Sequence, residues 1–124
     1  AVKGVKLHVS TDDGSMGFKG YNVQVLDQLL HGTWDMGHGT TVFACGPERM
    51  LKSVSEITAK AKIPSQFSLE RYMKCGYGLC GNCVVDPLGI RLCVEGPVVD
   101  NRTCVKITEF GKYHRDAFGK KHAF

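Results

Sequence analysis

The sequence lacks any long hydrophobic run: no tract approaches the ~20 apolar residues of a membrane-spanning helix, so we expect no membrane association. The first residues carry neither the apolar core nor the cleavage pattern of a secretory signal, and we therefore expect a cytoplasmic protein. Internal repeats and low-complexity tracts are also missing. With 43% hydrophobic residues the composition excludes disordered and collagen-like chains. The 124 residues predict a soluble globular protein of one domain or two very small ones.

The chain has little net charge outside its last thirteen residues. Sixteen Lys and Arg stand against 12 Asp and Glu, a formal charge of +4. Residues 112–124 hold four of these cations and only one anion, Asp116, so a flexible basic tail accounts for most of the charge. A nucleic-acid-binding protein of this size would show a basic stripe over its folded part. We therefore expect no nucleic-acid partner.

The first half of the chain is typical of an α/β layer. Strand and helix patterns alternate at residues 5–11, 21–30, 41–45 and 47–61. This order implies parallel strands joined by right-handed crossovers. The apolar run at 41–45 is typical of a strand buried on both faces. Only two strands are clear before Pro64, with residues 66–69 a possible third, which is too few for an open parallel sheet.

The glycine fingerprint of dinucleotide-binding domains is also absent, since residues 14–20 do not match G-x-G-x-x-G. Residues 1–63 therefore look like the C-terminal part of a nucleotide-binding domain, and we expect a fragment or a chain that a partner completes. After Pro64 the chain is rich in Gly and Cys and has only short β-like runs. The predicted fold is α/β: a partial parallel-sheet nucleotide-binding domain, a small Cys-rich β domain over residues 64–111, and the basic tail.

Four of the six cysteines are grouped in the second half, at Cys75, Cys80, Cys83 and Cys93. Their gaps of four, two and nine residues begin with the plant-type iron–sulfur spacing. Gly76, Gly78 and Gly81 lie in the first two of these gaps. Because glycine accepts a positive φ, these positions let backbone N–H groups turn toward cluster sulfurs. The pattern favours a [2Fe–2S] cluster.

Two other uses of the four cysteines stay open. Four thiolates also suit a tetrahedral zinc ion, although structural zinc sites more often use two close pairs and only Cys80 and Cys83 form one here. A disulfide framework has no support from a secretion signal. A zinc-stabilised interaction module with no redox role is therefore an alternative function.

Other candidate site residues give weaker signals. Cys45 ends the strand predicted at 41–45, at the edge of an α/β sheet where ligands bind, and is either a site thiol or an inert buried one. Cys104 lies in a strand predicted at 103–108 and is interpreted as structural. The pair Asp12 and Asp13, after the first strand, suits either the ribose hydroxyls of a dinucleotide or a solvated turn. No Ser, His and carboxylate stand at a catalytic spacing, and no catalytic residue is assigned.

Longer segments carry a family resemblance. The sequence SLERYMKCGYGLCGNC at 68–83, followed by RLCVEGPVVD at 91–100, resembles the C-terminal cluster domain of dihydroorotate dehydrogenase B electron-transfer subunits. STDDGSMGFKG at 10–20 and VFACGPERML at 42–51 are similar to the NAD-binding part of the same ferredoxin-reductase-like family. The resemblance covers nearly the whole chain and is least specific in the basic tail. The family's flavin-binding barrel is missing, so we expect this chain to bind little FAD.

The resemblance implies an electron path. In the family, NADH gives hydride to an FAD, and a [2Fe–2S] cluster passes single electrons to the FMN of a catalytic dihydroorotate dehydrogenase subunit in pyrimidine biosynthesis. It implies that the cluster ligands are Cys75, Cys80, Cys83 and Cys93. It also implies a nucleotide site made by Asp12, Gly14, Cys45, Gly46 and Pro47.

The expected partners follow from the same resemblance. They are the FMN-containing catalytic subunit and either a second copy or another chain that completes the sheet. A related possibility in the same chemical class is the small subunit of a flavin-dependent hydrogenase or of a NADH–ferredoxin oxidoreductase.

Overall fold

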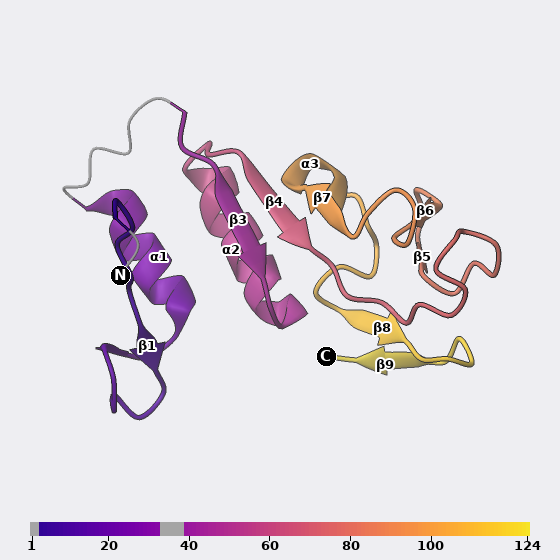
Figure 1. Ribbon diagram of the computed structural model, residues 1–124, viewed down its shortest axis with the longest axis horizontal. Helices are drawn as coiled ribbons and strands as arrows, with labels where there is room; N and C mark the ends of the chain where they lie inside the picture. Colours follow the sequence, from indigo (N-terminus) through magenta and orange to yellow (C-terminus); the bar gives the residue numbers. More distant parts are fainter. Residues whose placement is uncertain (1–2, 33–38) are drawn as a thin grey trace. The chain divides into compact units, whose positions relative to one another are not determined.

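The computed structural model describes residues 3–32 and 39–124 (Figure 1). The chain divides into two compact units, residues 1–38 and 39–124, and each is described by itself. None of the helices in the described ranges is both long and apolar enough to cross a membrane.

The first unit is a short strand–turn–strand–helix segment. Strands β1 (Ser10–Thr11) and β2 (Phe18–Lys19) pair in parallel, and helix α1 (Asn22–His31) follows. The helix predicted at 21–30 is confirmed. The strand predicted at 5–11 is wrong in length: only two residues form a ladder, because β2 offers only two partners and Val5 and Leu7 are exposed.

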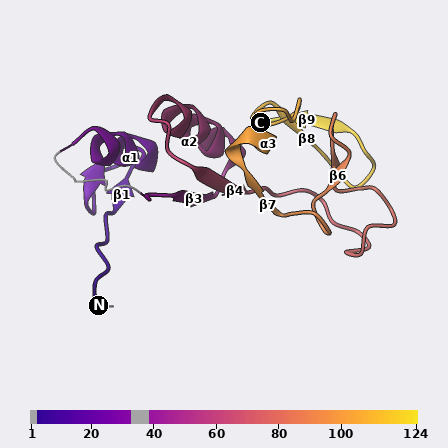
Figure 2. The same cartoon turned by 90° about the horizontal axis from the view of Figure 1, so that it is seen from above.

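The second unit is built on a three-stranded sheet. Its elements are β3 (Val42–Cys45), α2 (Glu48–Lys60), β4 (Ser65–Ser68) and β7 (Val98–Asp100). The strand order is β3-β4-β7, with β3 parallel and β7 antiparallel to the central β4. Helix α2 lies on one side of the β3–β4 pair (Figure 2). Two of the three strands follow residue 63, so the sheet is continuous across the predicted domain boundary.

The prediction that residues 41–45 are buried on both faces is wrong. Phe43 is 72% exposed and Cys45 is exposed as well. The reason is that β3 is an edge strand: within the described residues it pairs only with β4, and α2 covers only one of its faces.

The core of the second unit joins the sheet to the Cys-rich segment. Phe67 on β4 is fully buried and its ring lies 6.1 Å from that of Phe110. Leu51 on α2 and Leu92 in the Cys-rich segment are also fully buried. Because side chains from both sides of residue 64 share one core, the Cys-rich segment is held directly against the sheet.

Short elements complete the Cys-rich segment. They are the hairpin of β5 (Val84–Val85) and β6 (Ile90–Arg91), helix α3 (Asn101–Cys104), and the hairpin of β8 (Tyr113–Arg115) and β9 (Lys121–Ala123). The predicted fold class is confirmed: a small mixed α/β sheet followed by a Cys-rich segment of short β-hairpins.

Two expectations about this segment are wrong. The strand predicted at 103–108 is instead helix α3 followed by turns, because the Asp100 side chain accepts a hydrogen bond from the Thr103 N–H (2.7 Å) and caps a helical turn. Residues 112–124, expected to be a flexible tail, form the β8–β9 hairpin, which Arg115 ties to Asp86 at 2.6 Å.

Candidate functional site

The loop that carries the cysteines is folded around the thiol of Cys75. The backbone N–H of Cys80 donates a hydrogen bond to the Cys75 Sγ at 3.5 Å. This N–H, with those of Tyr77 and Leu79, lowers the pKa of Cys75 to about 6. Because backbone N–H groups stabilise the anionic form of sulfur, the loop favours a thiolate, the form that binds metal.

The four loop cysteines lie in two pairs. Cys75 and Cys80 form one pair, and the Cys80 side chain also helps to lower the pKa of Cys75. The β5–β6 hairpin brings together the other two: the Leu92 N–H donates to the Cys83 carbonyl at 3.3 Å, and a hydrogen bond between the thiols of Cys83 and Cys93, assisted by burial, raises the pKa of Cys93. In the two described ranges, no three His, Cys, Asp or Glu side chains are gathered so as to hold a single metal ion.

The glycines of this loop have the backbone conformation that the sequence predicts. Gly76, Gly78 and Gly81 have φ values of +77°, +85° and +72°. Gly78 is also needed for space, since a Cβ there would lie 2.7 Å from the Cγ2 of Val94. The Gly78 carbonyl accepts a hydrogen bond from the Arg91 side chain (3.4 Å), so a residue of β6 is tied to the loop.

The donor set fits an iron–sulfur cluster. Four thiolates are the usual ligands of a [2Fe–2S] centre, and thiolates are among the soft donors that select iron–sulfur clusters and zinc. The two pairs and the N–H groups around Cys75 suit a two-iron centre. The assignment of Cys75, Cys80, Cys83 and Cys93 as the ligands stays a prediction.

A pocket of about 900 Å³ opens at the carboxyl end of β3 and the first turn of α2. Gly46 and Pro47 from the predicted nucleotide site line it, as do Tyr72 and His114 from later segments. Cys45, which precedes them, is exposed. The interpretation of Cys45 as an inert buried thiol is therefore wrong, and its thiol is accessible at this edge of the sheet.

The other predicted nucleotide residues lie in the first unit. Asp12 is exposed, and Gly14, with φ of +78°, donates its N–H to the Thr11 carbonyl at 3.3 Å. The neighbouring Asp13 accepts from the Ser15 N–H at 2.9 Å, which lowers the pKa of Asp13. The segment is thus an ordered turn between β1 and β2. The nucleotide-binding role of Asp12 and Gly14 stays a prediction.

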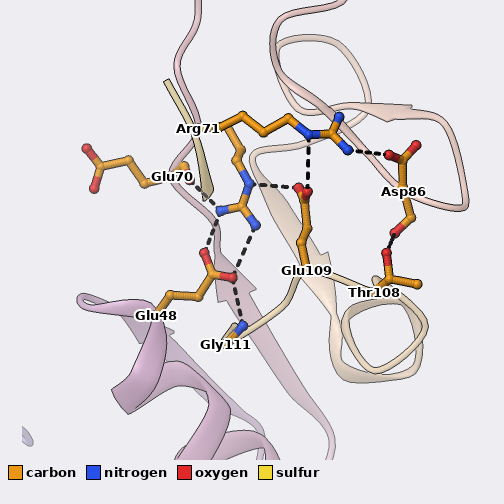
Figure 3. Close-up of polar contacts among 8 residues, drawn as sticks. Glu48, Glu70, Arg71, Asp86, Thr108, Glu109 and Gly111 are labelled. Carbon is orange, nitrogen blue, oxygen red and sulfur yellow. Dashed lines mark hydrogen bonds and ion pairs between the residues drawn. The ribbon is translucent and has the colours of Figure 1, made fainter. Parts of the chain in front are cut away.

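Sequence reasoning missed a buried charge network (Figure 3). The guanidinium of Arg71 lies between the carboxylates of Glu48 and Glu109, and all three side chains are at most 6% exposed. Burial alone would lower the pKa of Arg71, but the two carboxylates more than compensate and raise it. No pattern in the sequence links these residues, because 23 and 38 positions separate Arg71 from its partners.

Comparisons with known proteins agree with this geometry. The iron–sulfur cluster binding domain of dihydroorotate dehydrogenase B matches residues 70–105, a range that contains all four loop cysteines. A protein of Methanocaldococcus jannaschii, described as "Probable dihydroorotate dehydrogenase B (NAD(+)), electron transfer subunit", is 47% identical over 94% of this chain and 44% of its own length. A protein of the same description from Methanothermobacter thermautotrophicus is 43% identical over 95% of this chain and 42% of its own length.

A solved structure is also similar to this chain. It is that of an NADH-dependent reduced ferredoxin–NADP oxidoreductase studied for flavin-based electron bifurcation. The TM-score is 0.64 at 28% sequence identity, and the match covers 81% of this chain and 34% of that one. The chain thus spans less than half the length of the relatives it matches.

Proposed function

We propose that the chain belongs to the family of dihydroorotate dehydrogenase B electron-transfer subunits, that it holds a [2Fe–2S] cluster, and that it passes electrons toward a catalytic dihydroorotate dehydrogenase subunit. The observation that carries the proposal is the cysteine loop itself. Its spacing, its paired thiols and the N–H groups around Cys75 lie inside the range that matches a cluster-binding domain.

The proposed ligands are Cys75 and Cys80 from one side of the loop and Cys83 and Cys93 from the β5–β6 hairpin. A cluster held here supplies one-electron transfer. The protein's part is to keep the thiols ionised and to set the surroundings of the sulfurs. The N–H groups of Cys80, Tyr77 and Leu79 do this at Cys75.

The position of the loop suits electron transfer to a partner. Tyr77 and Leu79, which lie between the first two cysteines, are 71% and 78% exposed. Apolar side chains at an exposed loop are typical of a protein–protein contact. We propose that the partner is the FMN-containing catalytic subunit, which would approach over these side chains.

We further propose that Cys45, Gly46 and Pro47 lie at the nicotinamide end of an NAD(H) site. The roles of Asp12 and Gly14 in binding a dinucleotide stay predictions. The support is the pocket beside Gly46 and Pro47 at the carboxyl end of a parallel strand pair, where α/β sheets bind ligands. FAD and NAD are the cofactors expected of full-length family members, and this chain spans less than half the length of the relatives it matches. The cytoplasmic location expected from the sequence stays a prediction.

The cluster is tested by elemental analysis of anaerobically purified protein. We expect about two irons and two acid-labile sulfides per chain and an EPR signal after reduction, as four thiolates and two irons require. Cys80→Ser should lose most of the iron and the signal, whereas Cys45→Ser, which removes an exposed thiol outside the loop, should keep both. A colourless protein with one zinc and no sulfide would contradict the proposal, and full iron in Cys80→Ser would contradict the ligand set.

A second candidate function has one specific observation in its favour. The similar solved structure is an NADH-dependent ferredoxin–NADP oxidoreductase, so the electron acceptor could be a ferredoxin rather than a dihydroorotate dehydrogenase. The identity of the protein that accepts the electrons distinguishes the two candidate functions. Co-purification with an FMN-containing dihydroorotate dehydrogenase supports the first, and electron exchange with ferredoxin alone supports the second.

A further inference from the structure

The buried network around Arg71 lies between the two parts of the proposed electron path. Glu48 is the first residue of α2 and follows directly on Gly46 and Pro47, which line the pocket. Arg71 lies four residues before Cys75, in the segment that leads from β4 into the cysteine loop. One guanidinium therefore connects the pocket wall to the base of the loop.

The contacts of Arg71 leave it little freedom. Its Nη2 lies 3.1 Å from one carboxylate oxygen of Glu48, and its Nη1 hydrogen-bonds to the other. Its Nε donates to Glu109 at 3.1 Å, and its Nη1 also donates to the Glu70 carbonyl at 2.7 Å. Glu48 is held in turn by the Gly111 N–H at 2.9 Å. A planar guanidinium with bonds on three sides has one orientation.

The network also extends to Asp86 and Thr108 (Figure 3). Arg115 lies 4.0 Å from the second carboxylate oxygen of Glu109 and donates to Asp86 at 2.6 Å. The Asp86 carbonyl accepts the Thr108 N–H at 2.8 Å. Asp86 follows Cys83 by three residues, so both bases of the loop, before Cys75 and after Cys83, are tied to the same set of charges.

Stability alone is a weak reason for such a network. Burying ions costs solvation, and apolar side chains of similar volume often stabilise a protein equally well or better. Hydrogen bonds and ion pairs are directional, so they fix the groups that they join in a single relative position. Apolar contacts do not. A fixed position matters here because small displacements of reacting groups lower rates steeply.

We propose that Arg71, held by Glu48 and Glu109, is a positioning residue that fixes the cysteine loop at one distance from the pocket beside Gly46 and Pro47. The inference rests on the proposed function, because it is the cluster whose position is fixed. In this role Arg71 keeps constant the distance that electrons cross between the pocket and the cluster.

The test is a distance measured by pulsed EPR between the reduced cluster and a nitroxide attached to Cys45. This thiol is exposed and Cys104 is fully buried. In the holoprotein the proposed cluster would occupy the four loop cysteines. Both ends of the measured distance lie in the second unit. We expect one narrow distance in the native protein and in the control Glu56→Gln, which removes the anion of an exposed pair with Lys52 on the same helix.

Two variants separate geometry from charge and from stability. Arg71→Lys keeps the charge but not the planar fork and should broaden the distance distribution. The triple variant Glu48→Met, Arg71→Met, Glu109→Met leaves no buried charge in the triad, so we expect it to fold and keep its iron yet lose the single narrow distance.

The outcomes distinguish this inference from the proposed function. A native protein without a reduced-cluster signal overturns the proposed function and the inference with it. A native signal together with an unchanged narrow distance in the triple variant overturns the inference alone. A triple variant that does not fold or holds no iron shows that the triad is needed for folding, and this also overturns a separate positioning role.

Discussion

The two cysteines outside the loop have opposite surroundings. Burial raises the pKa of Cys104 to about 12, and the charges of Asp100 and Glu48 act in the same direction. Its side chain has no exposed surface. Cys45, in contrast, ends the edge strand β3 with an exposed thiol. The structural interpretation of Cys104 is confirmed, and the chemistry of the two thiols should differ accordingly.

This difference predicts selective alkylation. At pH 8 a thiol with a pKa near 12 is ionised in about one molecule in ten thousand, and the thiolate is the reactive form. Iodoacetamide added to the native holoprotein should therefore modify Cys45 and leave Cys104 untouched. Peptide mapping by mass spectrometry measures both sites, with denatured protein as the control in which both react. Comparable modification of Cys104 in the native protein would contradict the prediction.

Two glycines of the loop form a matched pair for substitution. Gly76 and Gly78 both have a positive φ, so alanine costs each about 1–2 kcal/mol of backbone strain. Only at Gly78 would the new Cβ meet neighbours, 2.7 Å from Val94 and 3.3 Å from Arg91, whereas nothing lies within 4 Å at Gly76. Gly78→Ala should therefore lose iron to a chelator faster than Gly76→Ala, measured by the decay of visible absorbance. Equal rates would show that space at Gly78 is not limiting.

At the residue scale, the sequence predicts the grouping of the cysteines better than the burial of the carboxylates. The cysteine loop is local, so its spacing and its glycines are visible in nine consecutive residues. Glu48 and Glu109 look like ordinary surface residues in the sequence. They are buried only because the chain brings Arg71 between them over separations of 23 and 38 residues.

At the element scale, helix α3 shows how one polar side chain overrides a strand pattern. The β-branched residues at 103–108 favour a strand. The Asp100 carboxylate instead accepts the Thr103 N–H, and this hydrogen bond lowers the pKa of Asp100. A helical turn follows, and it carries Cys104 into the core.

The capping bond predicts the behaviour of two variants. Asp100→Ala should lower the free energy of unfolding by about 1 kcal/mol at pH 7, whereas Asp100→Asn, which also caps, should change it little. A pKa lowered by folding means that the cap stabilises above the unfolded value of about 3.9 and that this contribution is lost as the pH falls through the folded value.

Denaturant unfolding as a function of pH measures this effect. The difference between wild type and Asp100→Asn should be small at pH 7 and should change only below about pH 4, because Asn does not titrate. Taking the difference removes the acid sensitivity that both proteins share. A gap between the two that already changes near pH 6 would contradict the assignment to Asp100.

The β8–β9 hairpin could not be predicted from its own composition. Basic residues at 112–124 are typical of a flexible tail, yet the segment is fixed by partners distant in the sequence. Asn82 donates to the Ala117 carbonyl at 3.3 Å across 35 residues, and Arg49 donates to the Phe124 carbonyl across 75. Within the hairpin, Asp116 and His122 pair at 2.9 Å. Contacts between residues so far apart in the sequence leave no periodic pattern from which they could be predicted.

At the scale of the whole molecule, the order of elements was predicted and their burial was not. The strand at 41–45 and the helix after Pro47 form as expected, and β4 confirms the possible third strand. An apolar strand pattern, however, assumes neighbours on both sides. In the described residues β3 has a neighbour on one side only, and Phe43 remains exposed.

The open edge of β3 predicts association. A strand that, among the described residues, pairs on one side only and carries an exposed aromatic ring is a template for another chain. We expect the 124-residue chain to self-associate in a concentration-dependent way, measured by light scattering. Phe43→Lys should shift the population toward monomer, because a charge on an edge strand opposes pairing. Val105→Lys, at a site that is also exposed but lies off the sheet, is the matched control. A wild-type chain that stays a monodisperse monomer at high concentration would show that the edge of β3 does not drive assembly.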